Sequence, residues 1–372
     1  MVARQAGATL LLAAFLAAAA AVPGRADADV GVRLRLLETL VRRGDSDWAL
    51  FALAAARVSL AATSETVKAE LAIDGLMGED IVASLARAFV AVRFPGFRFT
   101  AGKARLSWGE GVAFNAADLL YGSSSLAGLD LTADALRDDA SWMTALYLPL
   151  GRFSFAEAVI LPPALNVAAF LADPATAPGW STLAAGGRIV GKLAGIKTEA
   201  DYLYRGATGM HELAASLQGN LLVDWHLSAG TALAASSPQP SDLADNLRLS
   251  AGVFHLQRLG QRVTLSLRLE ALAAPFGEWH EVEAAGPPAP VYGLLLYPEA
   301  SLAIDSAVTV TARAVVSPID ASALLVPGVS VSLHKGLSFF GMASLGFGDD
   351  TDTWAWNRLG GLSFLAGCAY TY

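Results

Sequence analysis

The sequence predicts an all-β protein, an antiparallel transmembrane β-barrel of about 16–18 strands with long extracellular loops. Three observations lead to this prediction: an N-terminal segment typical of exported proteins, an apolar composition without long apolar runs, and short segments in which apolar and polar residues alternate. Together they indicate the outer membrane of a diderm, Gram-negative-type bacterium.

The N-terminus has the three parts of an export signal. Arg4 supplies a positive charge, residues 10–22 are uncharged and mostly apolar, and the small residues Gly24 and Ala26 precede Asp27. This order predicts a signal peptide over 1–26, cleaved near Ala26, and a barrel over 27–372. A retained transmembrane helix is the alternative, although the apolar part is short for the roughly 20 residues that a span needs.

The composition favours a membrane protein and argues against some partners. Hydrophobic residues make up 54% of the chain and the mean hydropathy is +0.46. Charged residues make up 16%, against roughly 25% in a soluble domain. The net charge of −8, which loss of Arg4 and Arg25 would make more negative, argues against nucleic acid as a partner. The single cysteine, Cys368, offers neither an internal disulfide nor a cysteine metal site.

The membrane segments are predicted to be strands. The longest apolar stretch after the signal, 158–172, is interrupted by Pro162 and Pro163. A closed barrel is the other structure that satisfies every backbone polar group in lipid. Residues 262–271 alternate strictly, with Arg, Thr, Ser, Arg and Glu on one face and Val, three Leu and Ala on the other. This is the pattern of a barrel strand that separates lumen from lipid.

Eighteen segments have strand character, and the connections between them alternate in length. They lie near 30–41, 48–62, 66–74, 82–94, 97–108, 141–150, 153–161, 181–193, 196–205, 211–218, 221–235, 247–258, 262–273, 291–304, 307–317, 323–334, 337–347 and 358–372. The long connections, 109–140, 162–180, 236–246 and 274–290, all follow odd-numbered segments, and short turns follow even-numbered ones. Because such barrels have short periplasmic turns and long outer loops, this predicts a periplasmic N-terminus.

The last strand suggests how the protein is assembled. Phe364, Cys368, Tyr370 and Tyr372 share one face of an alternating strand that ends in an aromatic residue. This resembles the C-terminal signal that outer-membrane barrels present to the barrel-assembly machinery. The expected partners are therefore that machinery, the lipid of the outer membrane and small solutes, while a homo-oligomer stays open.

The most distinctive motif begins on the fifth predicted strand. It reads Lys103-x-Arg105-x-Ser107-Trp108-Gly109-x-Gly111 and continues to Asn115-x-x-Asp118. The motif resembles a strand-and-loop motif of porin-like bacterial outer-membrane β-barrels, in which proline often follows the asparagine; here Ala116 does. The resemblance covers a small part of the chain and implies the class of protein without naming a substrate. Extending the strand alternation through the motif places Trp108 in lipid.

We expect the connection 109–140 to fold inward and narrow the pore. Opposed rows of charge would then set the selectivity of the channel. The acidic side of this predicted constriction is formed by Glu110, Asp118, Asp130 and Asp134. The basic, pore-lining side is formed by Lys103, Arg105, Arg188, Lys192, Arg262, Arg268 and Arg313. The alternative is a solvated acidic loop, with wall charges paired among themselves, as Arg268 could pair with Glu270.

The function that follows is a porin-like channel for passive diffusion of small hydrophilic solutes, with no catalytic residues, metal or other cofactor. Asp224 and His226 resemble the Asp-x-His pair of omptin proteases, but the predicted topology puts them at the periplasmic end, so no enzyme is expected. Two other functions stay open. One is a non-conducting surface barrel, an adhesin or structural protein, exposing loops 162–180 and 274–290. The other is a transporter of hydrophobic substrates, with Leu165, Val167, Phe170 and Leu171 near its entry.

Overall fold

The structure is a computed structural model of the chain. It describes residues 27–42, 47–78, 81–122, 140–163, 179–276, 293–305, 307–333, 336–349, 352–355 and 362–372. The predicted signal peptide, 1–26, lies outside these residues and stays a prediction.

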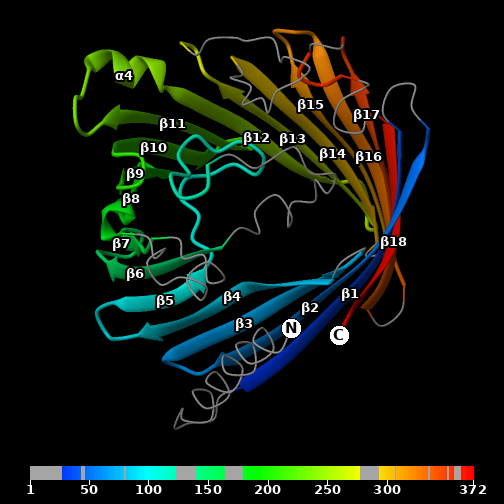
Figure 1. Cartoon of the computed structure of the whole chain (residues 1–372), viewed down its shortest axis with the longest axis horizontal. Coiled ribbons are helices and arrows are strands. Elements are labelled where there is room, and N and C mark those ends of the chain that lie inside the picture. The colour runs from blue at the N-terminus through cyan, green and yellow to red at the C-terminus, as the bar shows by residue number, and fades with distance from the viewer. Residues whose placement is uncertain are drawn as a thin grey trace.

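Within the described residues, eighteen antiparallel strands form one closed barrel (Figure 1). They are β1 (Asp27–Arg42), β2 (Ala49–Thr63), β3 (Val67–Met77), β4 (Ile81–Arg93), β5 (Arg98–Ala104), β6 (Ser141–Pro149), β7 (Phe155–Leu161), β8 (Ala184–Leu193), β9 (Ile196–Arg205), β10 (Met210–Asn220), β11 (Asp224–Ala234), β12 (Arg248–Arg258), β13 (Val263–Ala273), β14 (Leu294–Ile304), β15 (Val308–Ser317), β16 (Ser322–Ser332), β17 (Leu337–Phe347) and β18 (Leu362–Thr371). Each strand pairs with its neighbours in sequence, and β1 pairs with both β2 and β18, which closes the ring. The predicted fold class is confirmed.

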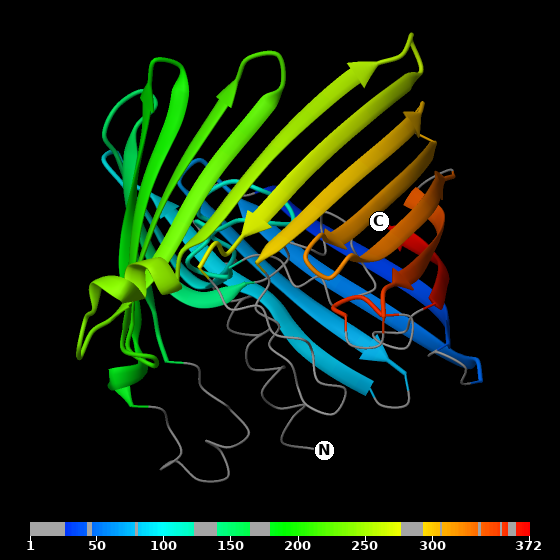
Figure 2. The same cartoon turned by 90° about the horizontal axis from the view of Figure 1, so that it is seen from above.

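The two ends of the barrel differ in their connections. Short turns join β2 to β3, β4 to β5 and each later even-numbered strand to the next; we call this the short-turn end. The other end, which carries the connections after β5, β7, β11, β13 and β17, is the long-loop end. The start of β1 and the end of β18 lie at the short-turn end. There Val32 and Tyr372 exchange backbone hydrogen bonds of 3.2 and 2.9 Å. Figure 2 shows the strands running obliquely along the wall, as closing a sheet into a barrel requires.

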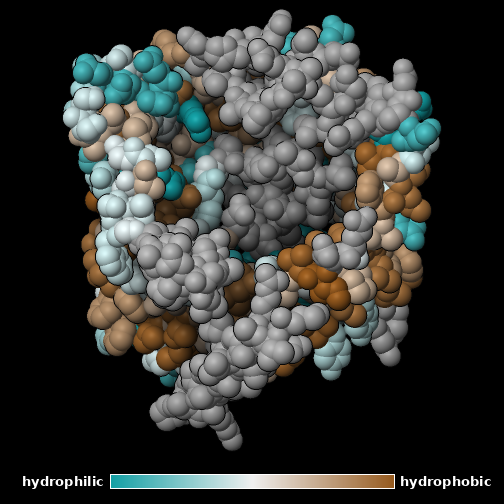
Figure 3. Space-filling model, viewed as in Figure 1, coloured by the Kyte–Doolittle hydropathy of each residue, from teal (hydrophilic) through white to brown (hydrophobic). Residues whose placement is uncertain are grey.

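The two faces of the wall follow the alternation of the sequence. On β13, Leu267 and Leu269 are 41% and 47% exposed on the outer face, whereas Arg268 and Glu270 point into the lumen, where Glu270 is 2% exposed. Hydrophobic residues gather on the right-hand edge in Figure 3, the side of β16 to β18 in Figure 1, and hydrophilic ones at the upper left over helix α4 (Pro240–Asp245). An apolar exterior of this kind suits lipid.

The predicted segments correspond to the observed strands with one informative exception. β5 ends at Ala104, not at residue 108, so the motif residues from Arg105 onward leave the wall. The described helical elements are α4, in the connection between β11 and β12, and a single 3₁₀ turn, η2 (Trp180–Thr182). Among the described residues, no helix has the length and apolar character that crossing a membrane would require.

Candidate functional site

Residues 105–122, which we call the inner segment, leave the end of β5 and run inside the barrel (Figure 1, teal). Gly102, near the end of β5, has a φ of +124°, a conformation that residues with a side chain rarely adopt. A Cβ there would also lie 2.1 Å from the carbonyl oxygen of Ala88 on β4. Glycine at this position therefore allows β5 to approach β4 closely just before the chain leaves the wall after Ala104.

The base of the inner segment is anchored by hydrophobic packing. Trp108 is fully buried, in a cluster with Leu119 and Leu120 of the same segment and with Met143 and Val159 on β6 and β7. The expectation that Trp108 faces lipid is wrong, because the strand alternation that predicted it stops at Ala104. The Trp108 carbonyl accepts a 2.7 Å hydrogen bond from the side-chain amide of Asn115, which fixes the fold of the segment.

A tyrosine ties the two ends of the connection together. The Tyr121 hydroxyl donates to the carbonyl of Ala104 and accepts the backbone N–H of Ser141, at the start of β6, at 3.0 Å. Burial raises the pKa of the Tyr121 phenol, so the hydroxyl keeps its proton and its role as a donor.

Charged side chains on β8 and β9 hold the next part of the segment. Arg188 donates to the Ser107 carbonyl at 3.1 Å, and Glu199 accepts the backbone N–H of Gly109 at 2.9 Å. Lys197 pairs with Glu110 at 2.6 Å. These two hydrogen bonds and the ion pair fix the segment to β8 and β9.

The segment then lies against a strip of small wall residues. Ser216, Ser228 and Ser250 form a cross-strand row on β10, β11 and β12, and all three are buried. Ser250 accepts the backbone N–H of Ala116 at 2.9 Å, a bond that proline at 116 could not make. A Cβ on Gly230 would lie 2.2 Å from the Ala116 carbonyl oxygen, so the close approach requires glycine on β11.

The tip of the segment reaches the opposite wall. Glu270 on β13 accepts the backbone N–H groups of Val112, Ala113 and Phe114 at 2.9 Å each. Phe114 meets Tyr297 on β14 edge-on, with ring centroids 6.4 Å apart.

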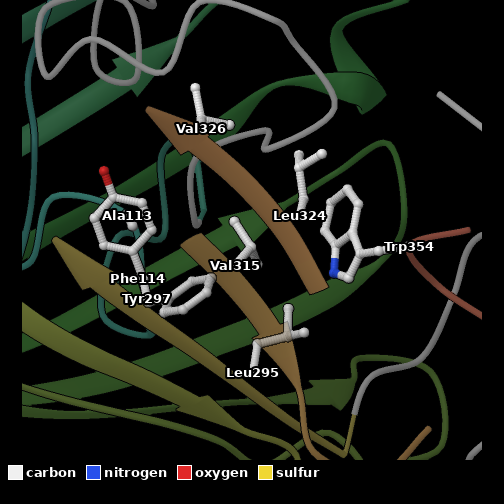
Figure 4. Packing of buried hydrophobic residues seen from close by; sticks show 8 residues of the cluster. All are labelled: Ala113, Phe114, Leu295, Tyr297, Val315, Leu324, Val326 and Trp354. Carbon is white, nitrogen blue, oxygen red and sulfur yellow. The ribbon is translucent and has the colours of Figure 1, made fainter. Parts of the chain in front are cut away.

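A second connection reaches the same place from the long-loop end. Figure 4 shows Trp354, from the connection between β17 and β18, grouped with residues of the tip and of the wall. Together they form a buried hydrophobic cluster, which we call the tip cluster: Ala113, Phe114, Leu295, Tyr297, Val315, Leu324, Val326 and Trp354. The cluster fills the lumen beside β14 to β16 with apolar side chains.

The turn between β15 and β16 holds the Trp354 segment. Asp320 accepts the Thr353 N–H at 2.8 Å and the Ser322 hydroxyl at 2.7 Å. Burial by itself would raise the pKa of Asp320, but hydrogen bonds from Thr353, Ser317 and Ser322 outweigh it, and the pKa lies below its ordinary value.

The inner segment thus follows the lumen from β6 to β14 and leaves a pocket on the other side. The pocket has a volume of about 590 Å³ and is bounded by β1 to β4 and the start of the inner segment. Its described lining includes Arg33, Arg35, Arg57, Arg87 and Arg105, which we call the arginine pocket. Arg57 pairs with Asp74 at 2.6 Å and Arg87 with Glu70 at 3.1 Å.

The structure groups only some of the predicted pore-lining bases. Arg105 lines the arginine pocket and Arg188 holds the inner segment. Arg268 and Arg313 lie together on the opposite wall, each within 4 Å of Glu299.

The other predicted bases lie apart from these. Lys192, near the short-turn end, lies over the Phe153 ring at 5.4 Å. Arg262 is 80% exposed at the rim of that end, 3.8 Å from Asp305. Lys103 lies opposite the half-exposed Trp142 in the register of β5 and β6, and its amine donates to the Leu85 carbonyl.

Of the four predicted acidic residues of the constriction, the structure describes two. Glu110 is on the inner segment and pairs with Lys197, which was not among the predicted pore-lining bases. Asp118 accepts hydrogen bonds from Ser107, Leu120 and Tyr121 and so shapes the segment itself. Asp130 and Asp134 lie outside the described residues. Glu199 was not predicted as a site residue, and Glu270 was considered only as a partner of Arg268, from which it lies 3.7 Å away. Both bind backbone N–H groups of the inner segment. Alternation shows which face a residue occupies but not which segment contacts it across the lumen.

The Asp224–His226 pair lies on the lumen face of β11. Asp224 begins the strand at the short-turn end and accepts a hydrogen bond from Asn220. The His226 ring lies beside Gly252, where a Cβ would come within 2.3 Å of it. No group of three or more His, Cys, Asp or Glu residues in the described ranges has the arrangement of a metal site.

Comparisons with known proteins give the fold. No family model and no curated protein matches the sequence. Solved structures do match: OccAB4 of Acinetobacter baumannii (9% identity, 94% of this chain and 100% of that one, TM-score 0.58) and OccK11 (OpdR) of Pseudomonas aeruginosa (9%, 93% and 96%, 0.56). Wzi of Escherichia coli, described as an outer membrane protein involved in group 1 capsule assembly and a carbohydrate-binding β-barrel, also matches (12%, 91% and 83%, 0.59). The chain therefore has the fold of an outer-membrane β-barrel.

Proposed function

We propose that this protein is a porin-like channel through which small hydrophilic solutes cross the outer membrane by passive diffusion. The observation that carries the proposal is the combination of an inner segment, which fills much of the lumen, with a charged pocket beside it. In a channel of this kind the segment is the constriction, and the arginine pocket is the part of the lumen along which solutes move.

Three features support a polar path. Barrels of this size are wide enough for an aqueous channel. The arginine pocket places cationic side chains where solutes would pass, as in pores selective for anions. The fold is shared with OccAB4, OccK11 and Wzi, and Wzi is described as a carbohydrate-binding β-barrel of the outer membrane.

The test is single-channel recording of the purified protein in planar lipid bilayers. The wild type should conduct, and deletion of residues 112–136 should increase the conductance, because it removes the tip that lies across the lumen. Circular dichroism of the deletion variant checks that the barrel is intact. A conducting wild type with an unchanged conductance after deletion would show that the segment is not the constriction.

The two other functions predict different results in related assays. A non-conducting surface barrel would give no channels at all. A transporter of hydrophobic substrates would take up fatty acids in liposomes and would not admit sugars in a swelling assay, whereas the proposed channel admits sugars. Most of the connections on which those functions depend, 164–178 and 277–292, lie outside the described residues.

A further inference from the structure

We infer that Glu270 is the positioning residue that sets the aperture of the channel; the inference rests on the proposed function. Its two carboxylate oxygens accept three consecutive backbone N–H groups of the inner segment, those of Val112, Ala113 and Phe114. Consecutive N–H groups that converge on one point form a strong anion-binding site. Here a carboxylate of the wall occupies that site.

The surroundings leave this carboxylate dependent on the segment. Glu270 is 2% exposed, and Arg268 approaches it only to 3.7 Å. A buried carboxylate without partners is costly, so the three N–H groups stabilise Glu270 as much as Glu270 holds them. Gly252 on the neighbouring strand provides the space, since a Cβ there would lie 3.0 Å from the Glu270 side chain.

The position of the tip decides which part of the lumen is filled. With the tip held on β13, Ala113 and Phe114 pack against Tyr297 and Trp354 in the tip cluster. The apolar cluster closes the lumen beside β14 to β16, and the arginine pocket beside β1 to β4 remains. Glu270 thus confines solutes to the cationic side, although it does not line the arginine pocket itself.

The first test compares two carboxylate-to-amide variants. Glu270→Gln keeps the size of the side chain but turns an N–H donor toward the three N–H groups, so the tip should detach. Glu299→Gln is the matched control, because Glu299 lies one strand away and is held by Tyr297 at 2.8 Å and Arg313 at 3.1 Å. Glu270→Gln should show a higher single-channel conductance and a weaker anion preference than the wild type, and Glu299→Gln should keep the wild-type conductance.

A reversible cross-link tests whether Glu270→Gln acts by releasing the tip of the inner segment or in some other way. Ala116 and Ser250 meet where the segment touches β12, with 2.9 Å between N and Oγ. Cysteines at both positions, in a Cys368→Ser background, should form a disulfide that holds the segment on the wall. In the Glu270→Gln variant, oxidation should restore the wild-type conductance and a thiol reductant should abolish the restoration.

The outcomes distinguish this inference from the proposed function. A wild type without conductance would contradict the function itself. A conducting wild type whose conductance and selectivity are unchanged in Glu270→Gln would overturn the role of Glu270 and leave the function standing. The role would also be overturned if the disulfide forms in the Glu270→Gln variant without restoring the wild-type conductance.

Discussion

At the scale of single residues, the site depends on buried charges that each have several partners. Arg188 joins β7, β8 and β9: it pairs with Glu157 at 2.8 Å and Glu199 at 2.9 Å and also donates to the inner segment. The side chains of the two glutamates are 3% and 0% exposed. Removing the guanidinium would leave both carboxylates in a site that water reaches poorly.

We therefore expect Arg188→Leu to destabilise the barrel by about 3–5 kcal/mol, the usual cost of breaking a buried ion pair. The control is Arg262→Leu at the exposed rim, which should change the free energy of unfolding by less than about 0.5 kcal/mol. Urea unfolding in detergent micelles, followed by tryptophan fluorescence, measures both. Equal effects of the two substitutions would show that the Arg188 network adds little stability.

At the scale of elements, two connections from the long-loop end meet inside the barrel. The inner segment contributes Phe114 to the tip cluster, and the segment 352–355 contributes Trp354. Asp320, in the turn before β16, holds the segment 352–355 by accepting the Thr353 N–H. Trp354 also donates its backbone N–H to the Ser322 hydroxyl at 3.2 Å, and that hydroxyl in turn bonds Asp320.

This attachment should weaken in acid. Because the pKa of Asp320 in the folded protein lies below its ordinary value of 3.8, its stabilising effect is complete above pH 3.8 and is lost as the pH falls through the lowered value. Hydrogen exchange at Thr353 and Trp354 should therefore be faster in strong acid than the chemistry of exchange alone predicts. Asp320→Asn should show the faster exchange at Thr353 and Trp354 already at neutral pH. The hypothesis fails if acid still accelerates exchange at these two residues in the variant beyond the chemistry of exchange.

At the scale of the whole molecule, the lumen is divided into unlike parts. The inner segment and the tip cluster fill it from β6 round to β16, and the arginine pocket lies beside β1 to β4. The arginine pocket is thus a cationic region inside the barrel of a chain whose net charge is −8. A channel is selective through the charge along its path and not through its total charge.

Neutralising Arg33 and Arg35 together, as glutamines, should shift the reversal potential in a salt gradient toward cations while conductance changes little. The physical reason is that both side chains line the arginine pocket, so their removal lowers the local concentration of anions. Arg42→Gln is the control, because Arg42 lies at the long-loop end of β1, over Trp48. If Arg42→Gln shifts the potential as much as the double variant, the selective path does not follow the arginine pocket.

The sequence by itself determined the class of fold and its strands. Successive side chains of a strand point to opposite faces, so a strand between lipid and lumen alternates apolar and polar residues, as β13 does. This alternation involves only neighbouring residues and can therefore be recognised in the sequence. It also put Arg188 on the lumen face of its strand, from which the side chain contacts the inner segment.

Only the tertiary structure decided what meets inside the barrel. Glu270, Ser250 and Trp354 are distant in sequence from the inner segment, and no periodicity relates them to it. Trp108 was misplaced because β5 ends at Ala104, and with it the periodicity on which the predicted position depended. Faces are set by neighbouring residues along one strand, whereas partners across a lumen are set by closure of the ring.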